Sequence, residues 1–190
     1  NLIEQLEIAV TAAETMADKK VDSAYMTITG DHIRCMNTQG AIALNRNKAN
    51  GTINNDPISQ RDINKVLELT QGIALPPDRD ILHTIPQEFI VDTLEKIDNP
   101  IGLSGRRLEG HVHLVTASTS GMENLIESAE ELGININGLV FKPLASAIPT
   151  LTKDEMKLGV SLIDIGSTTT SIAVFNEGAV RHSAVIPVGS

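Results

Sequence analysis

The sequence predicts a mixed α/β protein, on three observations. Residues 59–72 and 119–132 carry apolar residues at helical spacing behind Ser-based capping signals. Other segments alternate apolar and polar residues, as half-buried strands do. Residues 158–166 (LGVSLIDIG) are almost continuously apolar, which is typical of a strand buried on both faces. Helical and strand patterns are interleaved along the chain, so neither an all-α nor an all-β fold fits.

Composition limits the function classes. The 190 residues include 15 basic and 24 acidic side chains, for a net charge of -9, and 41% are hydrophobic, enough for a globular core. The acidity argues against a nucleic-acid partner. No apolar run reaches the ~18 residues of a membrane span, and the single cysteine, Cys35, excludes an internal disulfide. Because the chain starts at Asn1 and stops after a strand-like run, we expect a piece of a longer protein.

The first third of the chain predicts a helix followed by short strands. Residues 1–18 have an amphipathic helical pattern, and residues 21–29 alternate like a strand that Gly30 ends. Two short strands, HIRCMN and GAIALN, are expected on either side of a turn at Thr38-Gln39-Gly40. The Asn-rich stretch 46–57 predicts a mobile loop.

The middle of the chain predicts a capped helix and two long strands. Ser59 and Asp62 have the spacing of a capping box, with Ile58 and Ile63 placed as a hydrophobic staple. Residues 80–93 look extended, and Pro86 within them indicates an edge or a bulge. A further strand is expected at residues 107–117.

The last third predicts two helices and a strand-rich end. Ser120 and Glu123 suggest a capping box for the helix at 119–132, which Gly133 ends. A short strand at 137–141 leads to a helix at 143–151, where Pro143 suits a first helical position. The run 158–166 and two later strands follow, the latter pair joined by a turn at Asn176-Glu177-Gly178.

The segment from Asp164 to Ser171 carries the chemistry. It lies between two apolar strands, where Gly166 would permit a positive φ and successive amides would form an anion-binding nest. The hydroxyls of Ser167, Thr168 and Thr169 add donors. The Asp164 carboxylate would hold a hydrated Mg²⁺. The segment therefore predicts a phosphate-binding loop, with a polar hairpin that binds no ligand as the alternative.

This region resembles a known family. Residues 164–189 (DIGSTTTSIAVFNEGAVRHSAVIPVG) look like the second phosphate loop of the actin-like ATPase superfamily and, more narrowly, of the FtsA family of bacterial cell-division proteins. Further runs resemble FtsA segments in the same order, so the resemblance covers essentially the whole chain. They are ITGDHIRCMNTQGAIAL, LPPDRDILHTIPQEFIVD, NPIGLSGRRLEGHVHLVTA and LVFKPLASA.

The resemblance implies an incomplete actin-like (ribonuclease-H-like) core of two lobes with an FtsA-type inserted α+β subdomain. Residues 1–29 would be the edge of the first lobe and 30–117 the inserted subdomain. Residues 118–155 would return to the first lobe, and 156–190 would supply the first strands of the second lobe with the phosphate loop.

The resemblance also implies a function. FtsA-like proteins bind ATP with Mg²⁺, polymerise into protofilaments and link the FtsZ ring to the inner membrane. They therefore lie in the cytoplasm on the inner face of the membrane at the septum. Residues 30–117 would contact late division proteins, whereas the FtsZ site and the C-terminal membrane helix would lie outside this chain. We therefore expect the chain alone to be inactive and to hold no nucleotide.

Two departures from the family pattern bear on hydrolysis. Ser167 and Thr168 replace glycines of the loop, and Lys142 stands where related chaperone ATPases have the Glu that organises Mg²⁺ and the attacking water. A lysine cannot ligate a metal as a carboxylate does, although it could contact phosphate. We therefore expect weak or absent ATPase activity; the alternative is that Lys142 only faces solvent.

Three other readings remain open. The resemblance leaves a pilus-assembly actin-like ATPase, or a small-molecule kinase with the same nucleotide-binding core, as alternatives. His111 and His113 share one face of a strand and would start a metal site if further ligands lay nearby. Cys35 is expected to be a small buried apolar side chain rather than a nucleophile.

Overall fold

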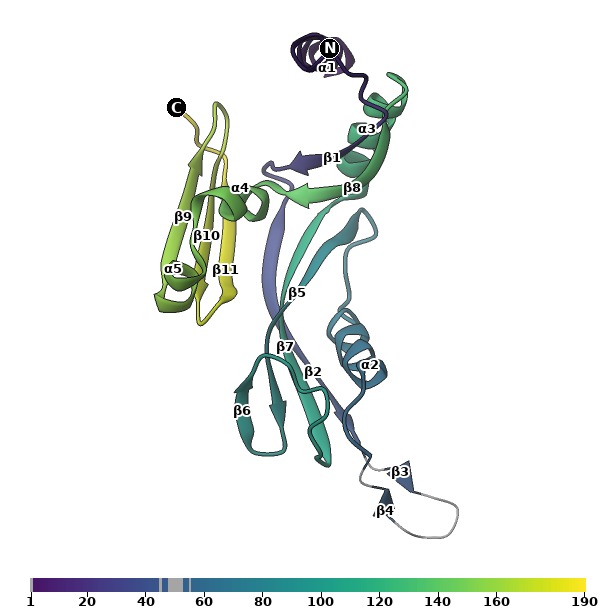
Figure 1. Ribbon diagram of the computed structural model, residues 1–190, viewed down its shortest axis with the longest axis vertical. Coiled ribbons are helices and arrows are strands. Elements are labelled where there is room, and N and C mark those ends of the chain that lie inside the picture. The colour runs from purple at the N-terminus through teal and green to yellow at the C-terminus, as the bar shows by residue number, and fades with distance from the viewer. Residues whose placement is uncertain (1, 45, 48–52, 55) are drawn as a thin grey trace.

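The computed structural model describes residues 2–44, 46–47, 53–54 and 56–190, and its elements form an elongated molecule of several small sheets (Figure 1). At one end, strands β1 (Ser23–Ile28) and β8 (Asn135–Phe141) pair in parallel. Helices α1 (Leu2–Ala17) and α3 (Thr119–Glu130) lie beside them. Because β1 and β8 are neighbours in space, the chain between them is an excursion that leaves this sheet and returns to it.

That excursion contains an antiparallel four-stranded sheet in the order β2-β7-β5-β6, with helix α2 against it (Figure 1). The pair β5·β7 is the longest ladder and includes a register shift at Pro86/Glu88, which is the bulge that Pro86 predicted. The strands and helix of this part are β2 (Arg34–Ala43), β3 (Arg46–Asn47), β4 (Ile53–Asn54), α2 (Gln60–Thr70), β5 (Arg79–Val91), β6 (Leu94–Ile97) and β7 (Arg107–Ser118).

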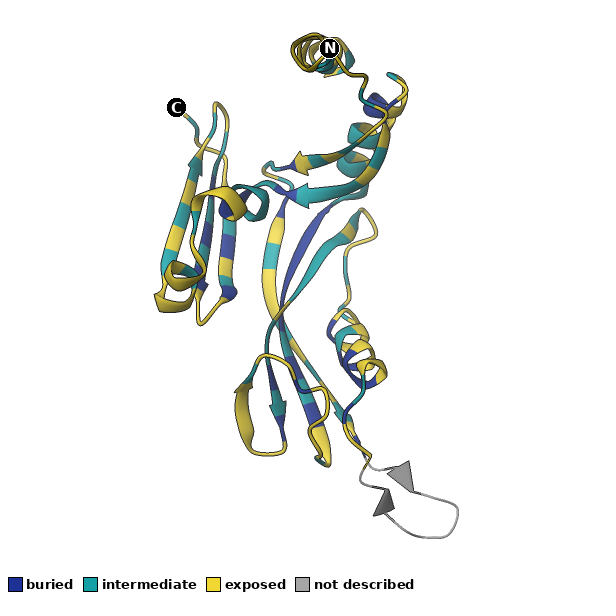
Figure 2. Ribbon diagram, in the orientation of Figure 1, coloured by how far each residue is buried: buried dark blue, intermediate teal, exposed yellow. Residues whose placement is uncertain are grey.

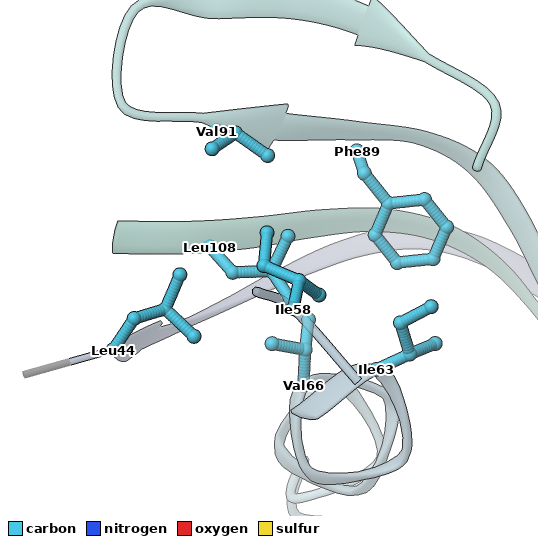
Figure 3. Close-up of a cluster of buried hydrophobic side chains, with 7 residues drawn as sticks. All are labelled: Leu44, Ile58, Ile63, Val66, Phe89, Val91 and Leu108. Carbon is cyan, nitrogen blue, oxygen red and sulfur yellow. The ribbon is translucent and has the colours of Figure 1, made fainter. Parts of the chain in front are cut away.

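The core of this part lies between α2 and the four-stranded sheet (Figure 3). Val66 of α2 and Leu108 of β7 are fully buried at its centre. Gly110 is required beside them, because a Cβ there would lie 2.6 Å from Val66 Cγ1. The predicted capping box is confirmed, since Asp62 Oδ2 accepts hydrogen bonds from the amide and hydroxyl of Ser59. The cluster comprises Leu44, Ile58, Ile63, Val66, Phe89, Val91 and Leu108.

The C-terminal part is an antiparallel three-stranded sheet, in the order β11-β10-β9, with helices α4 and α5 packed on one face. Buried Ala147 of α4 meets Ala173 and Phe175 of β10 there. The predicted hairpin turn is confirmed, with Glu177 at φ 54° and Gly178 at φ 78°. The elements are α4 (Lys142–Thr150), α5 (Lys153–Leu158), β9 (Val160–Ile165), β10 (Thr170–Asn176) and β11 (Ala179–Ile186).

Two expectations about the four-stranded sheet are wrong. β2 is one continuous strand, not two strands around a turn, because it pairs with β7 along its whole length. Gly40 serves close packing instead, since a Cβ there would lie 3.1 Å from Val66 O of the covering helix. The loop expected at 46–57 contains the paired strands β3 and β4; its mobility is a prediction that falls largely outside the described residues.

Two further corrections concern the C-terminal half. Helix α3 is capped by Ser118, whose Oγ accepts from Gly121 N at 3.0 Å, so Ser120 and Glu123 form no capping box. β9 is not buried on both faces: it is an edge strand whose residues alternate, with Ile163 60% and Ile165 65% exposed (Figure 2). β6 and α5 were not among the elements expected from the sequence. Among the described helices, none has both the length and the apolar character to cross a membrane.

Candidate functional site

The predicted phosphate loop is the tight connection between β9 and β10. Ile165 pairs with Thr170, and the Gly166 amide donates to Thr169 O at 2.9 Å, which closes the turn. Ser167 and Thr168 lie exposed at its tip. Among the described residues, no hydrogen bond uses the amide of either one. The loop therefore has two amides and two hydroxyls that make no hydrogen bond among the described residues, and such donors are what anion binding requires.

The role of Gly166 differs from the expectation. Its φ is not positive, and no residue from Asp164 to Ser171 adopts the left-handed region, so the αR–αL form of an anion nest is absent from this loop. Glycine is needed at this position because a Cβ would come within 3.1 Å of Thr169 O. The turn is closed by proximity of its two strands rather than by an unusual backbone conformation.

The residues after β11 support the loop, which the sequence reasoning did not foresee. Ser190 N donates to Gly166 O at 3.0 Å, and Thr170 Oγ1 donates to Val188 O at 2.7 Å. A Cβ on Gly189 would lie 2.3–2.5 Å from backbone atoms of Ser167 and Thr168, so only glycine fits between them. The signal that could have shown this is a glycine three residues past the end of a strand, where no turn requires it.

Lys142 lies at the loop and does not point away into solvent. Its Nζ donates to Asp164 Oδ1 at 2.9 Å, and Ser146 Oγ donates to Asp164 Oδ2 at 3.2 Å. Lys142 and Ser146 are one helical turn apart at the start of α4, so they share the face turned toward β9. This i, i+4 spacing was the available sequence signal for Ser146. The ammonium nitrogen also lies close to the loop, 4.0 Å from the position that a Cβ on Gly166 would occupy.

His83 of β5 fixes the strand end that carries Lys142. Its Nε2 accepts a hydrogen bond from the amide of Phe141 at 2.9 Å, which requires this nitrogen to be unprotonated. Burial lowers the pKa of His83, so the ring is neutral near pH 7 and the bond is available. The four-stranded sheet therefore contacts the residue immediately before Lys142.

The residues present do not fit the expected magnesium site. Mg²⁺ is usually held by one or two carboxylates together with waters and phosphate oxygens. Asp164 is the carboxylate at this loop, and both of its oxygens are engaged, one by the ammonium of Lys142 and one by Ser146. In the described part of the chain, no group of three or more His, Cys, Asp or Glu side chains could hold a metal.

The histidine pair forms no metal site either. His111 contacts Glu88 through Nδ1 and Glu109 through Nε2, so its two nitrogens face different partners. His113 is fully buried, with Nδ1 on Asn37 Oδ1 and Nε2 on Ser183 Oγ, both at 2.7 Å. Burial is the main reason why the pKa of His113 falls to about 4, and the nearby His182 lowers it further.

Cys35 is half buried rather than fully buried. Burial raises the pKa of its thiol. A raised pKa leaves little thiolate near pH 7, and the thiolate is the nucleophilic form.

Comparison with known proteins identifies the class of this fold. The solved structure described as "PilM-PilN type IV pilus biogenesis complex" aligns with a TM-score of 0.59 at 14% identity, over 93% of this chain and 46% of that one. At this identity the likeness concerns the fold alone, and the fold is of the actin-like class. Residues 30–116 match the family model described as "SHS2 domain inserted in FTSA". Residues 30–116 are therefore an SHS2 domain of the FtsA type.

The similar relatives are bacterial division proteins. "Cell division protein FtsA" of Pseudomonas aeruginosa is 38% identical over 98% of this chain. The proteins of the same name from Neisseria meningitidis and Escherichia coli K12 are 38% and 36% identical over the same share. The chain spans about 42% of the length of these relatives. The division of the chain into lobes at residues 29, 117 and 155 stays a prediction.

Proposed function

We propose that the protein containing this chain is an actin-like cell-division scaffold that binds ATP, polymerises and links the FtsZ ring to the inner face of the cell membrane. One observation carries the proposal: the similarity to proteins named cell division protein FtsA extends over 98% of the chain and includes the SHS2 domain. The pilus-complex neighbour supports the fold only.

The proposed ATP site uses the β9–β10 loop and Lys142. The amides and hydroxyls of Ser167 and Thr168, which make no hydrogen bond among the described residues, together with Thr169, would bind phosphate oxygens. Lys142 would add a positive charge within reach of the same place. The remaining contacts to the nucleotide would come from parts of the full-length protein beyond these residues, so the chain alone is expected to bind ATP weakly or not at all.

Hydrolysis is proposed to be weak or absent. A general base or metal-bound water would need a free carboxylate near the phosphate, and Asp164 is engaged by Lys142 and Ser146. A phosphate-release assay on the full-length protein is expected to show turnover close to the buffer control. Rapid release that saturates with ATP would contradict this part of the proposal.

The partner surfaces follow from the family. Residues 30–117 are proposed to contact late division proteins and neighbouring subunits of the polymer. FtsZ and the membrane are proposed to be bound by parts of the full-length protein outside this chain. The protein would then lie in the cytoplasm, peripheral on the membrane at the septum.

The experiment uses the full-length protein carrying a fluorescent tag, together with fluorescent ATP. Septal localisation, and filamentous cells on depletion, would support the scaffold role; a dispersed protein with normal septation would contradict it.

For the ATP site, Gly189→Ala forces a methyl group against the Ser167 and Thr168 backbone and is expected to weaken ATP binding severalfold. Gly138→Ala is the matched control, because its Cβ would be at an ordinary 3.4 Å from Tyr25.

A further inference from the structure

We propose that Lys142 takes the place of the divalent cation at the phosphate loop, so that this protein binds nucleotide phosphate without Mg²⁺. The inference rests on the proposed ATP site and adds a property to it. It follows from the mismatch described above between the magnesium site that the sequence predicts and the ion pair that the structure contains.

The carboxylate that would hold the metal is already neutralised. Asp164 is 17% exposed and Lys142 36% exposed in their side chains, so their 2.9 Å ion pair is partly withdrawn from water. Ser146 occupies the second carboxylate oxygen. A metal ion bound at the Asp164 oxygens would lie beside the ammonium, and a lysine and a divalent cation repel each other at short range.

The ammonium is placed to do electrostatically what the metal would do. It has three N–H donors, of which Asp164 takes one in this structure. It lies beside Gly166, where the loop begins, so phosphate oxygens held by the loop amides would come within its reach. A lysine acts on phosphate as a point charge and needs no water shell or octahedral set of ligands.

The position of Lys142 is set by its surroundings. It is the first residue of α4, directly after Phe141, whose side chain is fully buried and whose amide is bound by His83. Pro143 follows it and fixes the backbone of the first helical turn. The charge is thus held at the loop before any ligand arrives, which reduces the entropy lost on binding.

The test measures binding of fluorescent ATP to the full-length protein, with excess EDTA and with Mg²⁺. The wild-type affinity is expected to change less than about threefold between the two conditions. Lys142→Met keeps the apolar stem but loses the charge, and is expected to bind about tenfold more weakly in EDTA and to regain part of the loss with Mg²⁺. Lys142→Arg keeps the charge and should bind in EDTA.

The control and the contrary outcomes separate the two proposals. Lys153→Met removes an exposed lysine of α5 and should behave as wild type. Wild-type binding that EDTA abolishes, or a Lys142→Met protein that matches wild type in EDTA, overturns this inference and leaves the ATP site standing. A wild-type protein that binds in neither condition overturns both. Circular dichroism of each variant confirms that it is folded.

Discussion

The four-stranded and three-stranded sheets use the same strand signals but differ in how they are covered. The four-stranded sheet has helix α2 on its apolar face, and its core residues Val66, Val91 and Leu108 are at most 1% exposed. The three-stranded sheet has α4 and α5 on one face only, and Ile163, Ile165 and Ile186 of its other face remain 44–65% exposed (Figure 2). Both sheets therefore have an apolar core on the face that their helices cover, whereas the outer face of the three-stranded sheet carries exposed apolar side chains.

The difference shows that strand patterns predict pairing better than they predict burial. A near-continuous apolar run identifies a strand suited to two apolar environments, but each environment has to be supplied by other elements. For β9, the described residues supply an apolar environment on one face only. Truncating a buried side chain of a covered core and truncating an exposed side chain of β9 should therefore change the free energy of unfolding by different amounts. The stabilities of the two sheets should be coupled only through the residues that contact each other.

The largest expected effect separates the buried core of the four-stranded sheet from the exposed face of the three-stranded sheet. Leu108→Ala removes a fully buried side chain from the closed cluster and should lower the free energy of unfolding by about 2–5 kcal/mol. Ile163→Ala, on the open face, should change it by no more than about 0.5 kcal/mol. Urea unfolding of both variants measures the contrast. Equal losses would show that the outer face of the three-stranded sheet is buried in solution.

Polar contacts join the two sheets, alongside apolar contacts of Ile85 of β5 with the core of the three-stranded sheet and of Val185 of β11 with the cluster around Val115. Asn37 donates to Arg181 O at 3.0 Å, and Gln87 donates to Val180 O at 2.6 Å. His113 joins Asn37 to Ser183 across the same junction. Because Asn37 Oδ1 accepts, His113 carries its proton on Nδ1 and accepts from Ser183 at Nε2 in the neutral form.

The second prediction uses pH to weaken this junction. The pKa of His113 is about 4 when folded, against about 6.5 when unfolded, because burial disfavours its charged form. The unfolded chain binds more protons between these values, so the stabilisation is complete above pH 6.5 and is lost as pH falls toward 4. The loss should approach about 3 kcal/mol in urea titrations at successive pH values.

Matched variants test whether His113 is responsible. His113→Gln removes the titrating group and should flatten the pH dependence in this window. His182→Gln removes an exposed histidine whose charge is the lesser cause of the low pKa, so most of the dependence should remain. If His182→Gln flattened the profile instead, the assignment to burial of His113 would be wrong.

Sequence patterns predicted a local structure correctly where that structure depends only on residues close together in the sequence. The Ser59–Asp62 capping box, the bulge at Pro86 and the turn at Glu177-Gly178 are all confirmed. Gly40 was misread, because its reason is the approach of a helix that lies 20 residues or more along the chain. A glycine in one sequence does not reveal whether the backbone or a distant neighbour requires it.

The sequence predicted which residues lie at the candidate site, but not how they interact there. Asp164 and Lys142 both lie at the loop, Asp164 as its position at a strand end suggested and Lys142 as the resemblance to actin-like ATPases implied. Their direct pairing could not be predicted, since it depends on how α4 packs against β9, and that packing changes a possible metal ligand into one half of an ion pair. Gly189 was missed for the same reason, as its contact with the loop is made in space.

The smallest expected effect concerns the second place where the two sheets meet. Lys96 of β6 pairs with Glu177 of the β10–β11 turn, and Glu177 also pairs with Arg181. The pairing with Glu177 raises the pKa of Lys96, and that with Lys96 lowers the pKa of Glu177. Both partners are fully solvated, so salt screens the attraction and ordering two side chains opposes it. Lys96→Ala should therefore leave the urea midpoint unchanged within error at 0.15 M salt. A resolved destabilisation that persists in 1 M salt would mean that this turn, and not the His113 contacts, holds the sheets together.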